Sequence, residues 1–154
     1  MTPATPPRRN PNVLLQTFVV GQLASELIRR ELEPLGMTAN EYGVQSVIGA
    51  FGPLTPTDLA TRLGMAPPTV SAWIRRLAER DLIHKLPHPS DRRSYLVELT
   101  EEGRRRVSEA VPRFGVALVA VEAELGDRLD AVWEGGQAFQ EALRAALAAR
   151  SDLK

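Results

Sequence analysis

The chain has 154 residues, 44% of them hydrophobic and 25% charged, which is typical of a soluble globular protein with one sizeable core. It contains no cysteine, and this excludes disulfide bonds, thiolate zinc sites and a cysteine redox sensor. The first residues lack the apolar stretch of a secretory signal, and no run approaches the roughly 18 apolar residues of a membrane span. We therefore expect a cytoplasmic protein with no membrane partner.

The charges are unevenly distributed although the formal net charge is zero. Residues 62–106 contain ten Arg or Lys against six Asp or Glu, a net of +4, whereas residues 1–61 and 107–154 carry −1 and −3. A basic middle segment between acidic ends is typical of a local site for a polyanion on a neutral scaffold. A charged surface that only contacts solvent is the alternative explanation.

The chain begins with a proline-rich segment, and we predict a disordered tail at residues 1–12. From residue 13 to residue 32, apolar side chains recur every three or four positions, which predicts an amphipathic helix. Pro34 and Gly36 end this helix.

Three more helix starts follow in the next part of the chain. Residues 38–41 form a capping box, so a second helix is predicted to run to about residue 51. Thr55 and Pro56 start a short helix that ends at Gly64, and Pro67 starts another that continues to about Arg80. Two short helices joined by a glycine-containing turn predict a helix-turn-helix.

The helix at about 67–80 has two different faces. Val70, Ile74 and Leu77 form an apolar stripe that is expected to face the core. Trp73 lies at the border of this stripe and is expected to be a core or interface residue. The other face is small and basic, which suits insertion into the major groove of DNA. The predicted DNA-binding residues on this helix are Pro68, Thr69, Ser71, Ala72, Arg75 and Arg76.

A β-hairpin is predicted directly after this helix. Residues 82–86 and 95–99 are predicted to form two strands, the second supported by its alternating pattern, and the segment between them is rich in turn-forming residues. A hairpin that follows a recognition helix is a wing. Asp91, Arg92 and Arg93 lie at its tip, where arginine is drawn to the negative potential of the minor groove.

Three short motifs in this region are informative together. They are DLATRLG at 58–64, TVS at 69–71, and DRR at 91–93 followed by LTEEG at 99–103. In these motifs the chain resembles the MarR family of bacterial transcriptional regulators. The resemblance implies a mainly α (α+β) fold, a winged helix-turn-helix whose N- and C-terminal helices interlock into a homodimer.

The resemblance also implies how the chain is organised. Residues 13–154 would form a single MarR-like domain, with the winged-helix DNA-binding part at 38–103 and a helical dimerisation part at 13–35 and 104–150. Thr100 is expected to cap the long helix after the wing, and Pro112 is expected to kink it without ending it. The start of the last helix is left open, because either Gly126 or the pair at 135–136 could interrupt the apolar pattern.

Several residues are assigned roles through the same resemblance. The family's Asp-x-Arg spacing falls on Asp91 and Arg93, so we expect the Asp91 carboxylate to hold the Arg93 guanidinium ready for DNA, with Arg92 facing phosphate or solvent. The chain departs from the family at Ala72, where members often carry arginine. It also departs at Asp81, where a glycine usually adopts the left-handed conformation; aspartate reaches that conformation at modest cost.

An enzyme is the least supported class of function. His84, His88 and Asp91 could be imagined as a metal or general-base site, but they lie on the predicted hairpin and no further Cys or His ligand exists in the chain. No nucleophile elbow, P-loop or dinucleotide-binding fingerprint is present in the sequence. We therefore expect no enzymatic activity, no metal and no cofactor.

These observations predict a homodimeric transcriptional regulator that binds double-stranded DNA sequence-specifically. The recognition helix at about 67–80 would enter the major groove of a pseudo-palindromic operator, and the wing at 83–99 would enter the minor groove. The resemblance further implies a repressor that responds to a small-molecule effector bound between its DNA-binding and dimerisation layers. The alternative is a winged helix used only as a protein–protein interaction module, without DNA binding.

Overall fold

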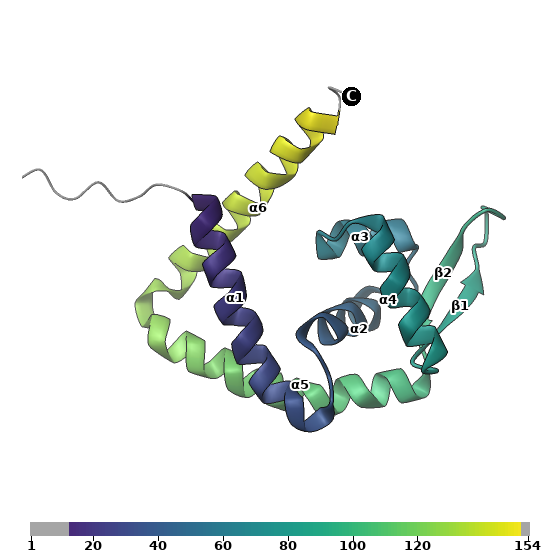
Figure 1. Cartoon of the computed structure of the whole chain (residues 1–154), viewed down its shortest axis with the longest axis horizontal. Coiled ribbons are helices and arrows are strands. Elements are labelled where there is room, and N and C mark those ends of the chain that lie inside the picture. The colour runs from purple at the N-terminus through teal and green to yellow at the C-terminus, as the bar shows by residue number, and fades with distance from the viewer. Residues whose placement is uncertain (1–12, 152–154) are drawn as a thin grey trace, which may run out of the picture. The chain divides into compact units, whose positions relative to one another are not determined.

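The computed structural model describes residues 13–151, so the predicted tail at 1–12 lies outside the described residues. The chain divides into two compact units, one up to Gly115 and one from Val116 onward. Helices make up most of both units, and the first unit also contains a small antiparallel sheet, which confirms the expected mainly α (α+β) class (Figure 1). No helix in the described part is long and apolar enough to cross a membrane.

The first unit begins with the elements that the sequence predicts. They are α1 (Val13–Leu32), the 3-10 helix η1 (Glu33–Leu35), α2 (Ala39–Phe51), α3 (Pro56–Leu63) and α4 (Pro67–Glu79). Thr38 caps α2 and Thr55 caps α3, since each hydroxyl oxygen accepts a hydrogen bond of 3.1 Å from the N–H three residues on. Gly64 ends α3 at a φ of 63°, a left-handed conformation that favours glycine.

The predicted wing forms, with its first strand shifted by one residue from the predicted 82–86. Strand β1 (Ile83–Pro87) pairs antiparallel with β2 (Tyr95–Leu99). The prediction that the first strand starts at Leu82 is wrong, because the Leu82 N–H donates to the Leu77 carbonyl and completes the end of α4. Leu54 also pairs with Val97, so the segment between α2 and α3 lies along the outer side of β2.

The long helix α5 (Glu101–Leu125) contains residues of both units. Thr100 caps it as predicted, since its hydroxyl accepts a bond of 3.0 Å from the Gly103 N–H, and the helix continues through Pro112. The second unit contains the 3-10 helix η2 (Gly126–Arg128) and α6 (Leu129–Ser151). Gly126 has a φ of 51° and α6 continues through the glycine pair at 135–136, which settles the boundary that the sequence leaves open.

One hydrophobic core holds α2, α3, α4 and the hairpin together. Its buried residues come from all of these elements: Val44, Ile48, Leu54, Leu59, Ala60, Val70, Ile74, Leu77, Leu82, Ile83, Val97 and Leu99. Gly103 of α5 packs closely on this core, because a Cβ at this position would lie 2.0 Å from the Leu82 carbonyl oxygen. The core therefore fixes α4 and the wing relative to each other and to the start of α5.

A second, smaller cluster connects α1 and η1 to α2 and α5. Leu32, Met37 and Ala110 are buried in it, and Tyr42 packs against them. The Tyr42 ring also stacks on Phe114 of α5, with ring centroids 4.9 Å apart.

Candidate nucleic-acid interface

Helix α4 presents a buried stripe and an exposed face, as predicted. Val70, Ile74 and Leu77 are buried in the core. Pro68, Thr69, Ser71, Arg75 and Arg76 are exposed, while Ala72 is half-buried at the edge of this face. Small side chains on the exposed face would let a helix approach the floor of a DNA groove.

The two arginines of α4 differ in their surroundings. The Arg76 guanidinium lies over the ring of Trp73, 5.2 Å from its centroid, and Trp73 is half-buried against the core. Trp73 thus packs at the edge of the core, in agreement with the expectation of a core or interface residue. The side chain of Arg75 has no ion pair or hydrogen bond within residues 13–151, so its charge is available to an external ligand.

The wing tip is organised by Asp91, though not in the way that the sequence predicts. The Asp91 carboxylate accepts a bond of 2.9 Å from the backbone N–H of Arg93, and the Ser94 N–H donates to the Asp91 carbonyl. Among the described residues, no carboxylate pairs with the guanidinium of Arg92 or Arg93, so the expected bond between the Asp91 and Arg93 side chains is absent. A short aspartate side chain reaches the N–H two residues on more readily than a distant guanidinium.

His88 is a second organiser of the tip, and sequence reasoning missed it. Its Nδ1 accepts hydrogen bonds from the backbone N–H of Asp91 at 3.0 Å and of Ser90 at 3.3 Å. A ring nitrogen can accept only when it carries no proton. His88 therefore closes the turn that carries Arg92 and Arg93.

The histidines and acidic residues of the wing do not assemble into a metal site. His84 pairs with Glu98 across the two strands at 3.2 Å, whereas His88 contacts the backbone of the tip. No group of three or more potential ligands comes together in the part of the chain that the structure describes.

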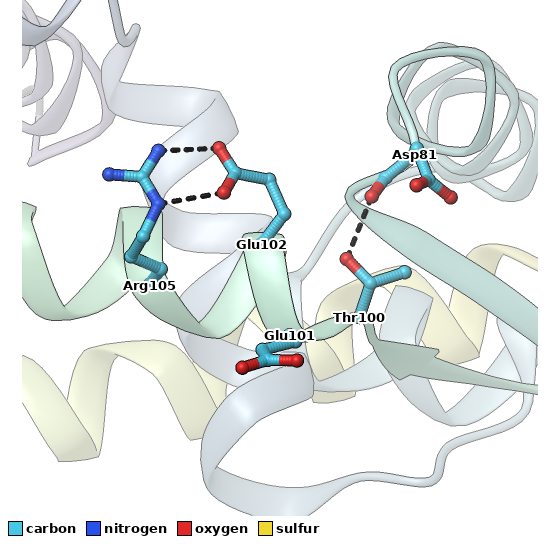
Figure 2. A pocket seen from close by; sticks show the side chains of 5 residues that line it. All are labelled: Asp81, Thr100, Glu101, Glu102 and Arg105. Carbon is cyan, nitrogen blue, oxygen red and sulfur yellow. Dashed lines mark hydrogen bonds and ion pairs between the residues drawn. The ribbon is translucent and has the colours of Figure 1, made fainter.

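Asp81 joins the end of α4 to the start of α5. Its φ of 53° is the left-handed conformation expected at this position, and the Asp81 and Leu82 N–H groups bond to Ala78 and Leu77. The Thr100 hydroxyl donates to the Asp81 carbonyl at 2.7 Å (Figure 2). The residue that replaces the family's glycine therefore keeps the expected helix end.

A shallow hollow of about 450 Å³ lies beside this junction, lined by Asp81, Thr100, Glu101, Glu102 and Arg105. Figure 2 shows that Arg105 is turned to Glu102, to which its Nε donates at 2.7 Å. This bond holds the pKa of Glu102 below its ordinary value. Arg105, the arginine that lines the hollow among the described residues, is thus already paired, and the hollow is a poor site for a phosphate.

A second hollow, of about 390 Å³, lies between α2 and α5 within the first unit. Its lining residues are Tyr42, Ser46, Gly49, Ala50, Leu99, Arg104, Val107, Ser108 and Val111. The Ser46 hydroxyl is buried and has no hydrogen-bond partner among the described residues. Arg104 Nη1 donates to the Leu99 carbonyl at 2.7 Å. A mainly apolar hollow with a free hydroxyl and one cation suits a small organic ligand.

Each unit also exposes an apolar surface, and contact of such a surface with water is unfavourable in free energy. In the first unit most of these exposed residues are on α1: Val13, Leu14, Leu15, Phe18, Val19, Val20 and Leu23. In the second unit they are on the end of α5 and on α6: Val116, Leu118, Val119, Val121, Leu129, Val132, Trp133 and Leu147. Trp133 has 69% of its surface exposed. Apolar surfaces of this extent are typical of contacts with another protein chain.

Comparisons with known proteins agree with this geometry. Residues 37–95 match the model of the MarR family. The multiple antibiotic resistance protein MarR of Salmonella typhimurium is 33% identical over 86 residues, which are 56% of this chain and 60% of the relative. The chain is thus matched to less than two thirds of that relative's length.

Two solved structures show the same fold at low identity. The Mycobacterium tuberculosis transcriptional regulator MosR, in complex with DNA, has a TM-score of 0.78 at 24% identity, covering 87% of this chain and 97% of that one. CouR from Rhodococcus jostii, bound to p-coumaroyl-CoA, has a TM-score of 0.68 at 24% identity, covering 86% and 92%. The family match, the Salmonella relative and the motifs of the helix-turn-helix and wing lead to one conclusion: residues 37–95, which include the helix-turn-helix, are similar to the MarR family.

Proposed function

We propose that this protein is a homodimeric transcriptional regulator that binds double-stranded DNA sequence-specifically. One observation carries the proposal: the exposed face of α4 and the wing tip, held in one unit by a common core, present Arg75, Arg76, Arg92 and Arg93 to the outside. No carboxylate pairs with any of these guanidiniums among the described residues. MosR, which has the same fold, is a transcriptional regulator solved in complex with DNA.

In this proposal α4 enters the major groove. Thr69, Ser71 and Ala72 allow a close approach, and Arg75 and Arg76 bond to guanine edges or phosphates. Pro68 starts the helix beside the DNA backbone. At the wing tip, Arg93 enters the minor groove and Arg92 contacts phosphate, while Asp91 orders the turn that carries both.

The exposed apolar faces support a homodimer. Burying the surfaces of α1 and α6 against a second copy would remove large side chains from water, at about 25 cal/mol for each Å² of apolar area. A two-fold symmetric dimer places two recognition helices on one side of the duplex. Its operator is therefore a pseudo-palindrome with half-sites about 10 base pairs apart, centre to centre.

The hollow between α2 and α5 is the proposed effector site. It lies beside Leu99, at the end of the wing, so a bound molecule would contact the DNA-binding part directly. CouR, of the same fold, was solved with a small molecule, p-coumaroyl-CoA. We infer a cytoplasmic repressor, without enzymatic activity, that an organic effector releases from its operator.

Selection from a random duplex library, followed by sequencing of the bound DNA, tests the proposal. The expected result is enrichment of one pseudo-palindromic sequence, and Arg75→Ala should weaken the enrichment. Recovery of unenriched DNA, or of none, would instead favour a winged helix that contacts only proteins. Competition with unrelated duplex DNA at moderate salt separates specific binding from attraction to phosphates alone.

A further inference from the structure

A buried carboxylate lies at a junction that the DNA-binding face does not explain. Glu41, in the first turn of α2, is only 4% exposed. Its backbone N–H bonds to Thr38, as in a capping box, and a closed box would return the Glu41 carboxylate to the Thr38 N–H. Within the described residues that return bond is not formed, and the carboxylate is turned to other partners.

Three side chains surround one oxygen of this carboxylate. Glu41 Oε1 lies 2.9 Å from Arg80 Nη1, 3.3 Å from Gln45 Nε2 and 3.8 Å from Arg106 Nη2. Arg80 is the residue directly after α4 and caps its end, whereas Arg106 belongs to α5. Arg106 Nη2 also donates to the carbonyl of Leu35 in η1 at 3.3 Å. One carboxylate therefore connects the end of the recognition helix to α2 and α5 and, through Arg106, to η1.

Stability alone is a weak reason for this arrangement. Removing a carboxylate and a guanidinium from water costs several kcal/mol, so a buried ion pair is often no more stabilising than apolar residues of similar size. The network is also incompletely satisfied, because Arg106 Nε and Gln45 Oε1 are buried without a partner among the described residues. The network does fix the direction of the end of α4, because a guanidinium bound to a carboxylate restricts the segment that carries it.

We propose that Glu41 is a positioning residue that sets the direction of α4 relative to α5 for the reading of DNA. The inference rests on the proposed function. Arg80 and Asp81 together hold the last turn of α4, Arg80 through Glu41 and Asp81 through Thr100 of the wing base. Loss of the contact between Glu41 and Arg80 removes one of these two contacts from the last turn of α4. The exposed arginines remain, but the angle at which α4 meets base edges is no longer fixed.

Glu41→Gln and Glu79→Gln form a matched pair of variants. Both remove one negative charge near the recognition helix, but Glu79 is exposed and has no partner among the described residues. Simple electrostatics predicts that both variants bind DNA more tightly. If Glu41 is a positioning residue, only Glu41→Gln should bind the selected duplex more weakly, by about fivefold or more. This is the size of a typical coupling between contacting residues. Its affinity for a scrambled duplex of the same length should be unchanged or higher.

The measured quantity is the ratio of the affinities for the selected and the scrambled duplex. A purely structural role of Glu41 would leave this ratio unchanged. A variant that is merely less stable melts at a lower temperature, but its folded fraction discriminates between the duplexes as well as the wild type does. The loss should also vanish in an Arg80→Gln background, because Glu41 then has no helix end to hold. Fluorescence anisotropy, at a temperature where circular dichroism shows every variant folded, gives each dissociation constant.

Arg80→Lys keeps the test decisive if Glu41→Gln does not fold. The Arg80 side chain is 45% exposed, so this substitution leaves no cavity and keeps the positive charge near DNA. It is expected to lower discrimination in the same direction. If Glu41→Gln distinguishes the selected duplex from the scrambled one as well as the wild type does, the inference about Glu41 is wrong and the proposed function stands. If Glu41→Gln is unfolded, the same result in Arg80→Lys has the same meaning. A wild-type chain that selects no duplex overturns the proposed function and this inference with it.

Discussion

Substitution of Asp91 separates two effects that a wing carboxylate has on DNA binding. As a negative charge beside DNA it weakens binding, whereas as the acceptor of the 2.9 Å bond from Arg93 N–H it orders the turn before DNA arrives. Asp91→Asn removes the charge and keeps an oxygen that can accept this bond. Asp91→Ala removes both. The difference between the two variants therefore isolates the hydrogen bond.

The magnitude follows from the exposure of the bond. A solvent-accessible hydrogen bond of this kind contributes about 0.5–1.5 kcal/mol, which corresponds to about a 2- to 13-fold change in dissociation constant. Asp91→Asn should bind the operator as tightly as the wild type or more tightly. Asp91→Ala should bind the operator more weakly than Asp91→Asn by about this same factor, although both variants have the same charge.

Fluorescence anisotropy on one operator at fixed salt measures this difference. In an Arg93→Ala background the ratio between the Asn and Ala variants should fall to about one, because no inserted side chain remains to be positioned. Equal binding by Asp91→Ala and Asp91→Asn in the wild-type background would refute the reasoning and make Asp91 an ordinary turn residue.

Four further predictions address the fold, the interface and the assembly. Gly103→Ala should lower the free energy of unfolding by at least about 2 kcal/mol in urea, because its Cβ would overlap the carbonyl of Leu82; unchanged stability would contradict the close approach. Asp81→Gly should raise that free energy by up to about 1 kcal/mol, since glycine adopts a φ of 53° without strain, and a loss would show that the aspartate side chain matters more. Arg75→Ala should weaken operator binding by about 1–3 kcal/mol, measured by anisotropy, and an unchanged affinity would remove it from the interface. Phe18→Glu should convert a dimer at low micromolar concentration into a monomer in sedimentation, whereas a wild-type monomer at that concentration would contradict the proposed homodimer.

Local signals along the chain were sufficient for most of the fold. Thr38, Thr55 and Gly64 act over three or four residues, so their caps and turns could be read directly from the sequence. The left-handed conformation of Asp81 was expected from the family resemblance, in which a glycine usually occupies this position. The start of the first strand was misplaced by one residue because the N–H of Leu82 bonds back to α4 instead of entering the sheet.

The partners of the charged residues were only in part predictable from the sequence. The basic segment 62–106 contains ten cations, yet several of them serve the protein itself: Arg105 pairs with Glu102, Arg104 bonds to the carbonyl of Leu99, and Arg80 reaches Glu41. The first two contacts join residues three and five positions apart, whereas the pair of Arg80 with Glu41 depends on tertiary packing, which brings together residues far apart in the chain. At the wing tip, the sequence predicts that Asp91 and Arg93 lie close together. It does not predict that the Asp91 carboxylate binds the backbone N–H of Arg93 and not its guanidinium.

The salt dependence of operator binding tests the central claim most directly. Anisotropy titrations of the selected duplex and of a scrambled duplex, each from about 50 to 200 mM salt, give the number of phosphates neutralised and the discrimination in one data set. The account predicts that log affinity falls with log salt by about 0.9 for each phosphate contacted, and that the selected duplex stays at least about 1,000-fold tighter at physiological salt. A flat salt response, or equal affinity for the two duplexes, would contradict sequence-specific DNA binding by this chain.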